Sequence, residues 1–179
     1  TYKSDGTLDD TFGGDGWITA TVDGAAGVYA WSPRNLLQPD GKVIVGGIVV
    51  QTDDDIDLAL RRHNVDGSLD DTFGNGGIVV YDFDGVGNYA ENLRLLPDGK
   101  ILVAGGNGEV IDPFTYTIDE AFVLRLNEDG TLDDTFGNSG MVVWGQSGRA
   151  AGTEDLAVGP NGEIFVSGVL APTDDATED

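Results

Sequence analysis

The feature that most constrains the fold is a nine-residue motif that occurs three times along the chain. It reads Asp-Gly-Thr-Leu-Asp-Asp-Thr-Phe-Gly at 5–13, has Ser in place of the first Thr at 66–74, and returns in its first form at 129–137. The copies are separated by 61 residues (5 to 66) and by 63 residues (66 to 129). Such a period indicates tandem units that stack on their neighbours, so the sequence predicts a repeat protein.

A second motif keeps the same period. Pro-Asp-Gly-Lys stands at 39–42 and 97–100, and a weaker Pro-Asn-Gly-Glu stands at 160–163. Between these markers lie strand-like segments, at 35–38, 43–50, 57–64 and 77–83 in one unit and at 92–96, 100–104, 121–127 and 140–144 in the next. Four antiparallel strands per unit predict blades of a β-propeller; a β-solenoid is the alternative, but its rungs are usually shorter.

The expected fold is therefore all-β, with β-propeller-like blades of four antiparallel strands in about three repeats of roughly 60 residues. Residues 1–179 are predicted to form a single repeat domain, in which 1–30 end one blade, 31–90 and 91–150 are blades, and 151–179 begin another. Terminal strands are expected at Trp17–Val22, Asp155–Val158 and Glu163–Val169. Because closed propellers have about four to eight blades, we expect these strands to pair with another copy or with further repeats of a larger ring or assembly.

The nine-residue motif has a mechanical interpretation. The first Asp of its Asp-Asp pair is predicted to cap a single helical or 3₁₀ turn, and its last Gly to end that turn. Its Leu and Phe are predicted to fill the blade interior. Two arginines at equivalent strand positions are predicted to pair with an acid of the following turn, with ligand binding as the alternative. The structural residues assigned in this way are Asp9, Phe12, Gly13, Asp70, Phe73, Gly74, Asp133, Phe136, Gly137, Arg62 and Arg125.

The charge of the chain excludes several partners. Thirty-two acidic residues against nine basic ones give a net charge of −23. Such a surface repels nucleic acid and anionic membranes, and no apolar run approaches the roughly 20 residues of a membrane helix. Three interpretations stay open: a solubilising acidic surface, calcium binding, or attraction to a basic partner. The absence of cysteine and the single histidine disfavour a zinc site.

Calcium is the one cofactor that the sequence suggests. Two loops after predicted second strands are rich in the hard oxygen ligands that calcium prefers. The candidate ligands are Asp53, Asp54, Asp55, Asp57, Asp174 and Asp175. Neither loop has the spacing of an EF-hand, and a solvated acidic loop is the alternative interpretation.

The usual signatures of catalysis do not occur. His63 is the only histidine, and its equivalents in the other units are Tyr2 and Leu126, which indicates a strand residue rather than a catalytic base. No serine stands in a Gly-x-Ser-x-Gly elbow, and the carboxylate pairs recur in every unit as turn residues. The three tryptophans, Trp17, Trp31 and Trp144, are candidates for a sugar-stacking surface, with ordinary packing as the alternative.

The two motifs together resemble the delta-60 repeat family of large bacterial surface and secreted proteins. The resemblance is carried by Pro-Asp-Gly-Lys-Ile-Leu-Val-Ala-Gly at 97–105 and by Arg-Leu-Asn-Glu-Asp-Gly-Thr-Leu-Asp-Asp-Thr-Phe-Gly at 125–137. It implies a propeller-like all-β fold and an extracellular bacterial setting, and it implies no reaction. The chain departs from the pattern at Asn161 and Glu163, and in the longer loop at 106–117.

We therefore expect a non-catalytic structural or adhesive module at the cell surface, which self-associates or forms part of a larger propeller or filament. The alternatives are a calcium- or glycan-binding propeller and a propeller-based hydrolase. Other copies, further repeats or a glycan are the expected partners, and neither nucleic-acid binding nor membrane insertion is expected.

Overall fold

The computed structural model describes residues 1–18, 27–50, 56–83, 87–108, 110–112, 115–116, 120–145 and 149–172. Within these ranges the chain forms strands and turns, without a helix, as the sequence predicts. The strands are β1 (Gly27–Leu37), β2 (Val43–Val50), β3 (Ile56–His63), β4 (Ile78–Tyr81), β5 (Gly87–Leu95), β6 (Ile101–Gly108), β7 (Val110–Asp112), β8 (Thr115–Tyr116), β9 (Glu120–Leu126), β10 (Met141–Trp144), β11 (Arg149–Val158) and β12 (Ile164–Pro172).

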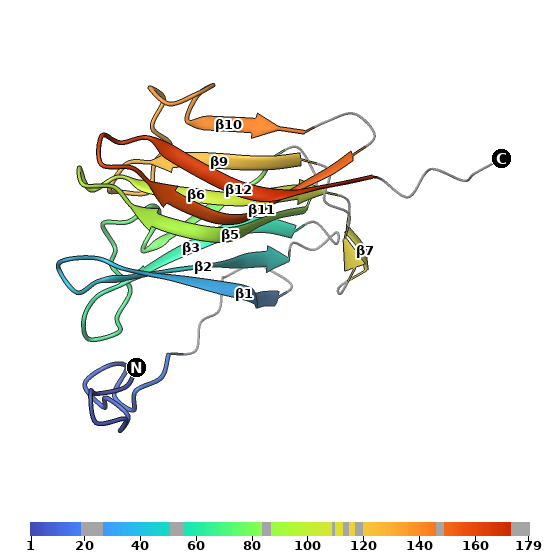
Figure 1. The fold of residues 1–179 in the computed structure, drawn as a ribbon. Coiled ribbons are helices and arrows are strands. Elements are labelled where there is room, and N and C mark those ends of the chain that lie inside the picture. Colours follow the sequence, from blue (N-terminus) through green and yellow to red (C-terminus); the bar gives the residue numbers. More distant parts are fainter. Residues whose placement is uncertain are drawn as a thin grey trace.

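The strands form two complete blades and part of a third. The first blade has the order β1-β2-β3-β4 and the second the order β5-β6-β9-β10, and β11 and β12 form a two-stranded sheet. Every pairing is antiparallel between strands that follow one another in each blade. The small hairpin β7-β8 lies in the long loop between β6 and β9 and protrudes at one end of the molecule (Figure 1). The prediction of four-stranded antiparallel blades is confirmed.

The apolar cores lie between neighbouring sheets. Strand β6 contributes side chains to both cores, because alternate side chains of a strand point to opposite faces of the sheet. Ile101 and Val103 join the core against the first blade, whereas Leu102 and Ala104 join the core against β11. Burial on both faces explains why β6 begins with an apolar run without a polar face.

The first strand of each blade is longer than the sequence indicates. Strand β1 begins at Gly27 rather than at residue 35, and β5 and β11 likewise begin at Gly87 and Arg149. Each of these strands contains a register shift, between Tyr29 and Arg34, Ala90 and Asn92, and Thr153 and Asp155. The extensions are rich in small and polar residues and lack the alternation of apolar and polar residues that predicts a strand. They form strands because they pair with the second strand of the blade. The blade boundaries expected after residues 30, 90 and 150 therefore fall inside strands.

The N-terminal unit, Thr1–Gly16, folds as a compact loop at one end of the molecule (Figure 1). It closes on itself through a bridge between Tyr2 and Leu8 and through the bond from the Thr1 ammonium to the Gly16 carbonyl, at 2.6 Å. Trp17 and Ile18 do not belong to a strand, and the rest of the strand expected at 17–22 lies outside the described residues. No helix long and apolar enough to cross a membrane is found among the described residues.

Candidate functional site: the junction between repeats

The motif forms the same capped turn in all three copies. The Oδ1 atom of Asp70 accepts the backbone N–H of Thr72 at 3.2 Å and its hydroxyl at 2.7 Å. The corresponding bonds of Asp9 and Asp133 have the same two lengths. The Phe73 N–H then donates to the Asp70 carbonyl, and Gly74 continues the chain at a φ of 56°. The Asp side chain therefore caps the turn, because its short carboxylate can accept the N–H of the residue two positions later.

The other carboxylate oxygen of this Asp joins the two sequence motifs. Oδ2 of Asp70 accepts Nε of Arg62 at 2.6 Å and Nζ of Lys42 at 2.7 Å. The Arg62 guanidinium also bonds to the Thr72 hydroxyl at 3.0 Å and lies over the Phe73 ring, 4.7 Å from its centroid. We call these five residues the first clamp.

The second complete unit repeats the clamp almost atom for atom. Asp133 accepts Arg125 at 2.6 Å and Lys100 at 2.7 Å, and Arg125 lies 4.7 Å from the centroid of the Phe136 ring. Thr135 takes the place of Thr72, at 3.1 Å from the guanidinium. Lys100, Arg125, Asp133, Thr135 and Phe136 form the second clamp. The N-terminal unit has Thr1 at the arginine position, so Asp9 makes the cap but not the ion pair.

The clamp aspartates are held ionised. Burial, the largest influence on Asp70, would raise its pKa, but the hydrogen bonds from Lys42, Thr72 and Arg62 outweigh it and leave the pKa well below its usual range. Hydrogen bonds from Lys100 and Thr135 likewise lower the pKa of Asp133. Each carboxylate receives four donors, from Lys, Arg, and the Thr amide and hydroxyl. Carboxylates engaged in this way hold structure and are poorly suited to proton transfer.

The clamp also reaches the next repeat. The Gly74 N–H donates to the Asp129 carbonyl at 2.8 Å, and the Gly13 N–H donates to the Asp66 carbonyl at the same distance. Each bond thus runs from the Gly that ends one motif to the Asp that begins the next. This bond defines what we call the repeat junction.

The junction between the first two blades contains further contacts. Nη1 of Arg62 donates to the Glu128 carbonyl at 2.5 Å, and the Tyr81 hydroxyl donates to the Gly130 carbonyl. The ring of Phe73 lies against Gly130 so closely that a Cβ there would be 2.8 Å from a ring carbon. The turn of the second motif is therefore covered by the clamp of the first blade.

Two stretches of the chain, residues 38–73 and 114–136, match the sequence model of a family described as a domain of unknown function (DUF5122) beta-propeller. These two stretches, 59 of the 179 residues (36 and 23), are similar to the DUF5122 beta-propeller family. The matched stretches include Lys42, Arg62 and Asp70 of the first clamp and Arg125 and Asp133 of the second. A comparison with curated proteins gave no match.

The three motif phenylalanines are not buried alike. Phe73 is fully buried between the first two blades, whereas Phe12 and Phe136 are half-buried. Phe136 packs against the core at β11 but has no following motif over it in the described structure. The expectation that all three fill a blade interior therefore holds fully for Phe73 alone, because burial depends on the next repeat as well as on the motif itself.

Polar contacts also join the second blade to the β11-β12 sheet. The Thr153 hydroxyl donates to Glu91 at 2.9 Å, and the Asn92 amide donates to the Glu154 carbonyl at 2.8 Å. Burial raises the pKa of Glu91, although the Thr153 bond opposes the shift. Glu91, Thr153 and Glu154 lie in the first-strand extensions that sequence patterns do not reveal, and Asn92 is the first residue of the strand expected at 92–96.

The calcium candidates do not meet in the described part of the chain. Asp53, Asp54, Asp55, Asp174 and Asp175 lie outside the described residues. Asp57 lies on β3, where its side chain is buried and its neighbour across the sheet is Val49. Among the described residues no group of three or more His, Cys, Asp or Glu side chains is placed to hold a metal ion.

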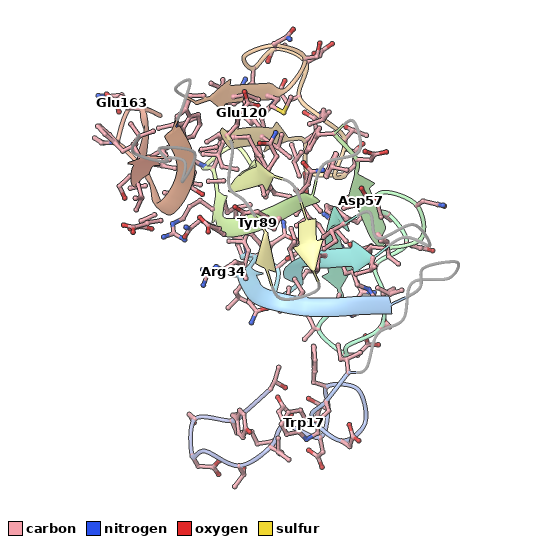
Figure 2. All side chains as sticks on the ribbon, turned by 90° about the vertical axis from the view of Figure 1, so that its right-hand side faces the viewer. Trp17, Arg34, Asp57, Tyr89, Glu120 and Glu163 are labelled. Carbon is pink, nitrogen blue, oxygen red and sulfur yellow. The ribbon has the colours of Figure 1, made fainter. Side chains whose placement is uncertain are left out.

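The remaining candidates occupy separate structural positions. His63 is buried on β3 with Nδ1 3.0 Å from the Gly67 carbonyl, and burial lowers its pKa. Trp17 lies on the N-terminal loops, where it meets Tyr2 edge to face, and Figure 2 shows it far from Tyr89 and Glu163. Trp144 is half-buried on β10, and the side chain of Trp31 lies outside the described residues.

Proposed function

We propose that this chain is a non-catalytic structural module of an extracellular or cell-surface protein, in which repeats are added in one direction through the junction. The observation that carries the proposal is the Gly N–H to Asp carbonyl bond, which has the same length at two successive junctions. Each motif therefore has one face that donates to its successor and one face that accepts from its predecessor. Such nearest-neighbour contacts are what allow repeat proteins to extend.

The electrostatics support a structural role. An acid or base in catalysis works best with a pKa near the working pH, whereas the clamp aspartates have lowered pKa values and a full set of donors. The net charge of −23 and the delta-60 resemblance support the extracellular setting. Labelling of intact cells with a membrane-impermeant reagent tests this location, and protection of the chain until the cells are lysed would contradict it.

The structural role is tested by removing one arginine from each clamp. Arg62→Met removes the ion pair and the bond to the Glu128 carbonyl, and breaking a buried pair of this kind costs about 3 kcal/mol. Arg125→Met is the matched control, because Arg125 makes the same contacts within its repeat. Its side chain is 24% exposed against 5% for Arg62. We expect Arg62→Met to be the more destabilising by at least about 1 kcal/mol, the usual net value of one hydrogen bond.

The measurement is chemical denaturation followed by circular dichroism and by tryptophan fluorescence. Loss of the junction should separate the unfolding of neighbouring repeats, so the two signals should cease to coincide in Arg62→Met. Equal losses of stability in the two variants, with coincident transitions in both, would show that the junction does not couple the repeats.

A further inference from the structure

Three Asn-Gly pairs occur in the chain, at 75–76, 107–108 and 161–162. Such a pair can rearrange without an enzyme, because the glycine nitrogen can attack Cγ of the asparagine and no Cβ on the glycine hinders its approach. The reaction requires a glycine N–H and an asparagine side chain that are free to meet, and access for water. The folded structure therefore determines which of the three pairs can react.

The pair at 107–108 is held in a sheet. Asn107 lies on β6, where it pairs with Asn88 of β5 and with Glu120 of β9, and its side-chain amide donates to Glu120 at 3.4 Å. Gly108 is buried. Closing a ring between these two residues would require this part of β6 to leave its neighbouring strands, so the fold protects Asn107.

The pair at 161–162 is exposed but restrained by hydrogen bonds. The Gly162 N–H, which holds the attacking nitrogen, donates to the Gly159 carbonyl at 3.1 Å. The side-chain amide of Asn161 donates to Glu163 at 2.9 Å, and its backbone N–H donates to the same carboxylate at 3.0 Å. Both reacting groups are therefore engaged elsewhere.

The pair at 75–76 has neither restraint. Asn75 and Gly76 are exposed, and a Cβ placed on Gly76 would have no atom within 4 Å. Neither the Gly76 N–H nor the Asn75 side chain has a hydrogen-bond partner among the described residues. With φ values of 62° at Gly76 and 93° at Gly77, the two glycines form the tight turn that leads into β4.

We propose that Asn75 is a site of spontaneous deamidation in the folded protein. The Gly76 nitrogen forms a bond to Cγ of Asn75, the bond from Cγ to Nδ2 breaks, and the nitrogen's proton leaves with the amide group as ammonia. The product is a cyclic imide, which water then opens. Attack of water at Cγ gives aspartate, whereas attack at the main-chain carbonyl carbon gives isoaspartate, in which the main chain runs through the former side chain.

Isoaspartate at position 75 lengthens the main chain inside a turn that two hydrogen bonds close. The Gly77 N–H donates to the Phe73 carbonyl at 2.8 Å, and the Asn75 N–H donates to the Ile78 carbonyl at 2.8 Å. Both bonds span the added carbon atom. Because this turn leads into β4, which contacts the next repeat at Gly130, isoaspartate loosens the start of that strand. Aspartate leaves the chain length unchanged and does not.

The second blade supplies a matched control. Asn138 begins the same turn, with its N–H donating to the Met141 carbonyl at 2.7 Å, but the next residue is Ser139, at a φ of 52°. The serine side chain hinders closure of the ring. Gly76→Ser therefore gives the first turn the sequence of the second, and Ser139→Gly does the reverse; circular dichroism checks that both variants fold.

The test is incubation of the folded protein at mildly alkaline pH, followed by digestion and mass spectrometry to locate the gain of about 1 Da that replacement of an amide by an acid produces. Asn75 should react severalfold faster than Asn138. Gly76→Ser should slow Asn75 to the rate of Asn138, and Ser139→Gly should raise Asn138 to the rate of Asn75. Similar rates at Asn75 and Asn138 in the wild-type chain overturn the proposal.

Incubation in urea separates the effect of the fold from that of the sequence. Unfolded chains should deamidate at similar rates at Asn75, Asn107 and Asn161, whereas the folded chain should react severalfold faster at Asn75 than at the other two. Equal rates at the three sites in the folded chain overturn the protection argued above and the proposal with it.

The structural consequence is tested by melting. Protein aged until isoaspartate has formed at position 75, as measured by enzymatic methylation of isoaspartate, should unfold at a lower temperature than fresh protein. Asn75→Asp carries the same added charge without the longer main chain, so it should melt close to the fresh protein. An aged sample that melts together with Asn75→Asp overturns the assignment of the loosening to the lengthened turn.

Discussion

The close approach of two repeats at Gly130 can be tested by adding a single methyl group. Gly130→Ala places a Cβ 2.8 and 2.9 Å from two ring carbons of Phe73 and 2.9 Å from Cγ1 of Val79. Optimal separations of carbon atoms are about 3.5–4.0 Å. The ring is fully buried and carries the Arg62 guanidinium on its face, so it cannot move aside without disturbing the first clamp.

Two effects add at Gly130. Alanine in the left-handed region costs about 1 kcal/mol, and overpacking a buried site typically costs about 1–3 kcal/mol more. Gly6→Ala carries only the first penalty, because its φ is 84° against 87° at Gly130 while its surroundings are empty. The difference between the two variants is therefore about 2 kcal/mol, which corresponds to about 4–8 °C in melting temperature for a chain of this size.

Thermal unfolding followed by circular dichroism at low protein concentration measures both variants. Low concentration ensures that the melting temperatures report the stability of the single chain. We expect Gly130→Ala to melt well below Gly6→Ala, with Gly67→Ala, whose Cβ would meet the Gly13 backbone at 2.7 Å, also below it. Equal melting temperatures for all three would refute the reasoning, because the three glycines have nearly the same φ and differ in what would meet their Cβ.

Two further predictions concern charge. Burial lowers the pKa of His63 in the folded state, so the unfolded chain takes up a proton first as pH falls below about 6.5 and stability decreases by at most about 1.4 kcal/mol per pH unit. His63→Leu should remove this dependence between pH 7 and 5, measured by denaturant unfolding, and an unchanged slope would assign it to other groups. The clamp aspartates have lowered pKa values and lose their contribution only below about pH 4, so the two windows do not overlap. For the whole chain, the melting temperature should rise with NaCl because a charge of −23 repels itself; a flat or falling curve would count against this.

The sequence identified the blades because strand signals and turn signals recur with one period. The all-β class, the antiparallel four-stranded blades, the strand Val43–Val50 and the strand expected at 140–144, observed as Met141–Trp144, follow from that recurrence. The first strands β5 and β11 were predicted too short, since their N-terminal halves are mostly small or polar residues and are held by pairing with the second strand, not by their own β propensity. The strand bounds were thus predicted correctly where the side-chain pattern determines the strand. They were predicted too short where pairing with the neighbouring strand determines it.

The clamp was only partly visible in the sequence. The pairing of each arginine with an acid of the next turn was expected, but Lys42 and Lys100 were not assigned to it. Each lysine stands in the other motif, and antiparallel pairing of the second and third strands brings it to the carboxylate. The constant phase of the two motifs was the signal that could have placed both lysines beside the aspartates.

The repeat junction itself leaves little trace in a sequence, because its central bond joins two backbone groups that every residue but proline possesses. The residue types at equivalent positions do reflect the environment of each repeat. Phe122, Leu124 and Leu126 of the second blade are buried against the first blade, and the equivalent residues on β3 are Ala59, Arg61 and His63. Burial lowers the pKa of Arg61, and its Nε and Nη1 atoms are buried without a hydrogen-bond partner among the described residues. An apolar trio thus stands where the first two blades meet, and a small and basic trio, of which Ala59 and His63 are buried, stands on the face of β3 that points away from the second blade. Departures from the repeat pattern therefore report that the two faces have different surroundings, and the matches report the turn that joins one repeat to the next.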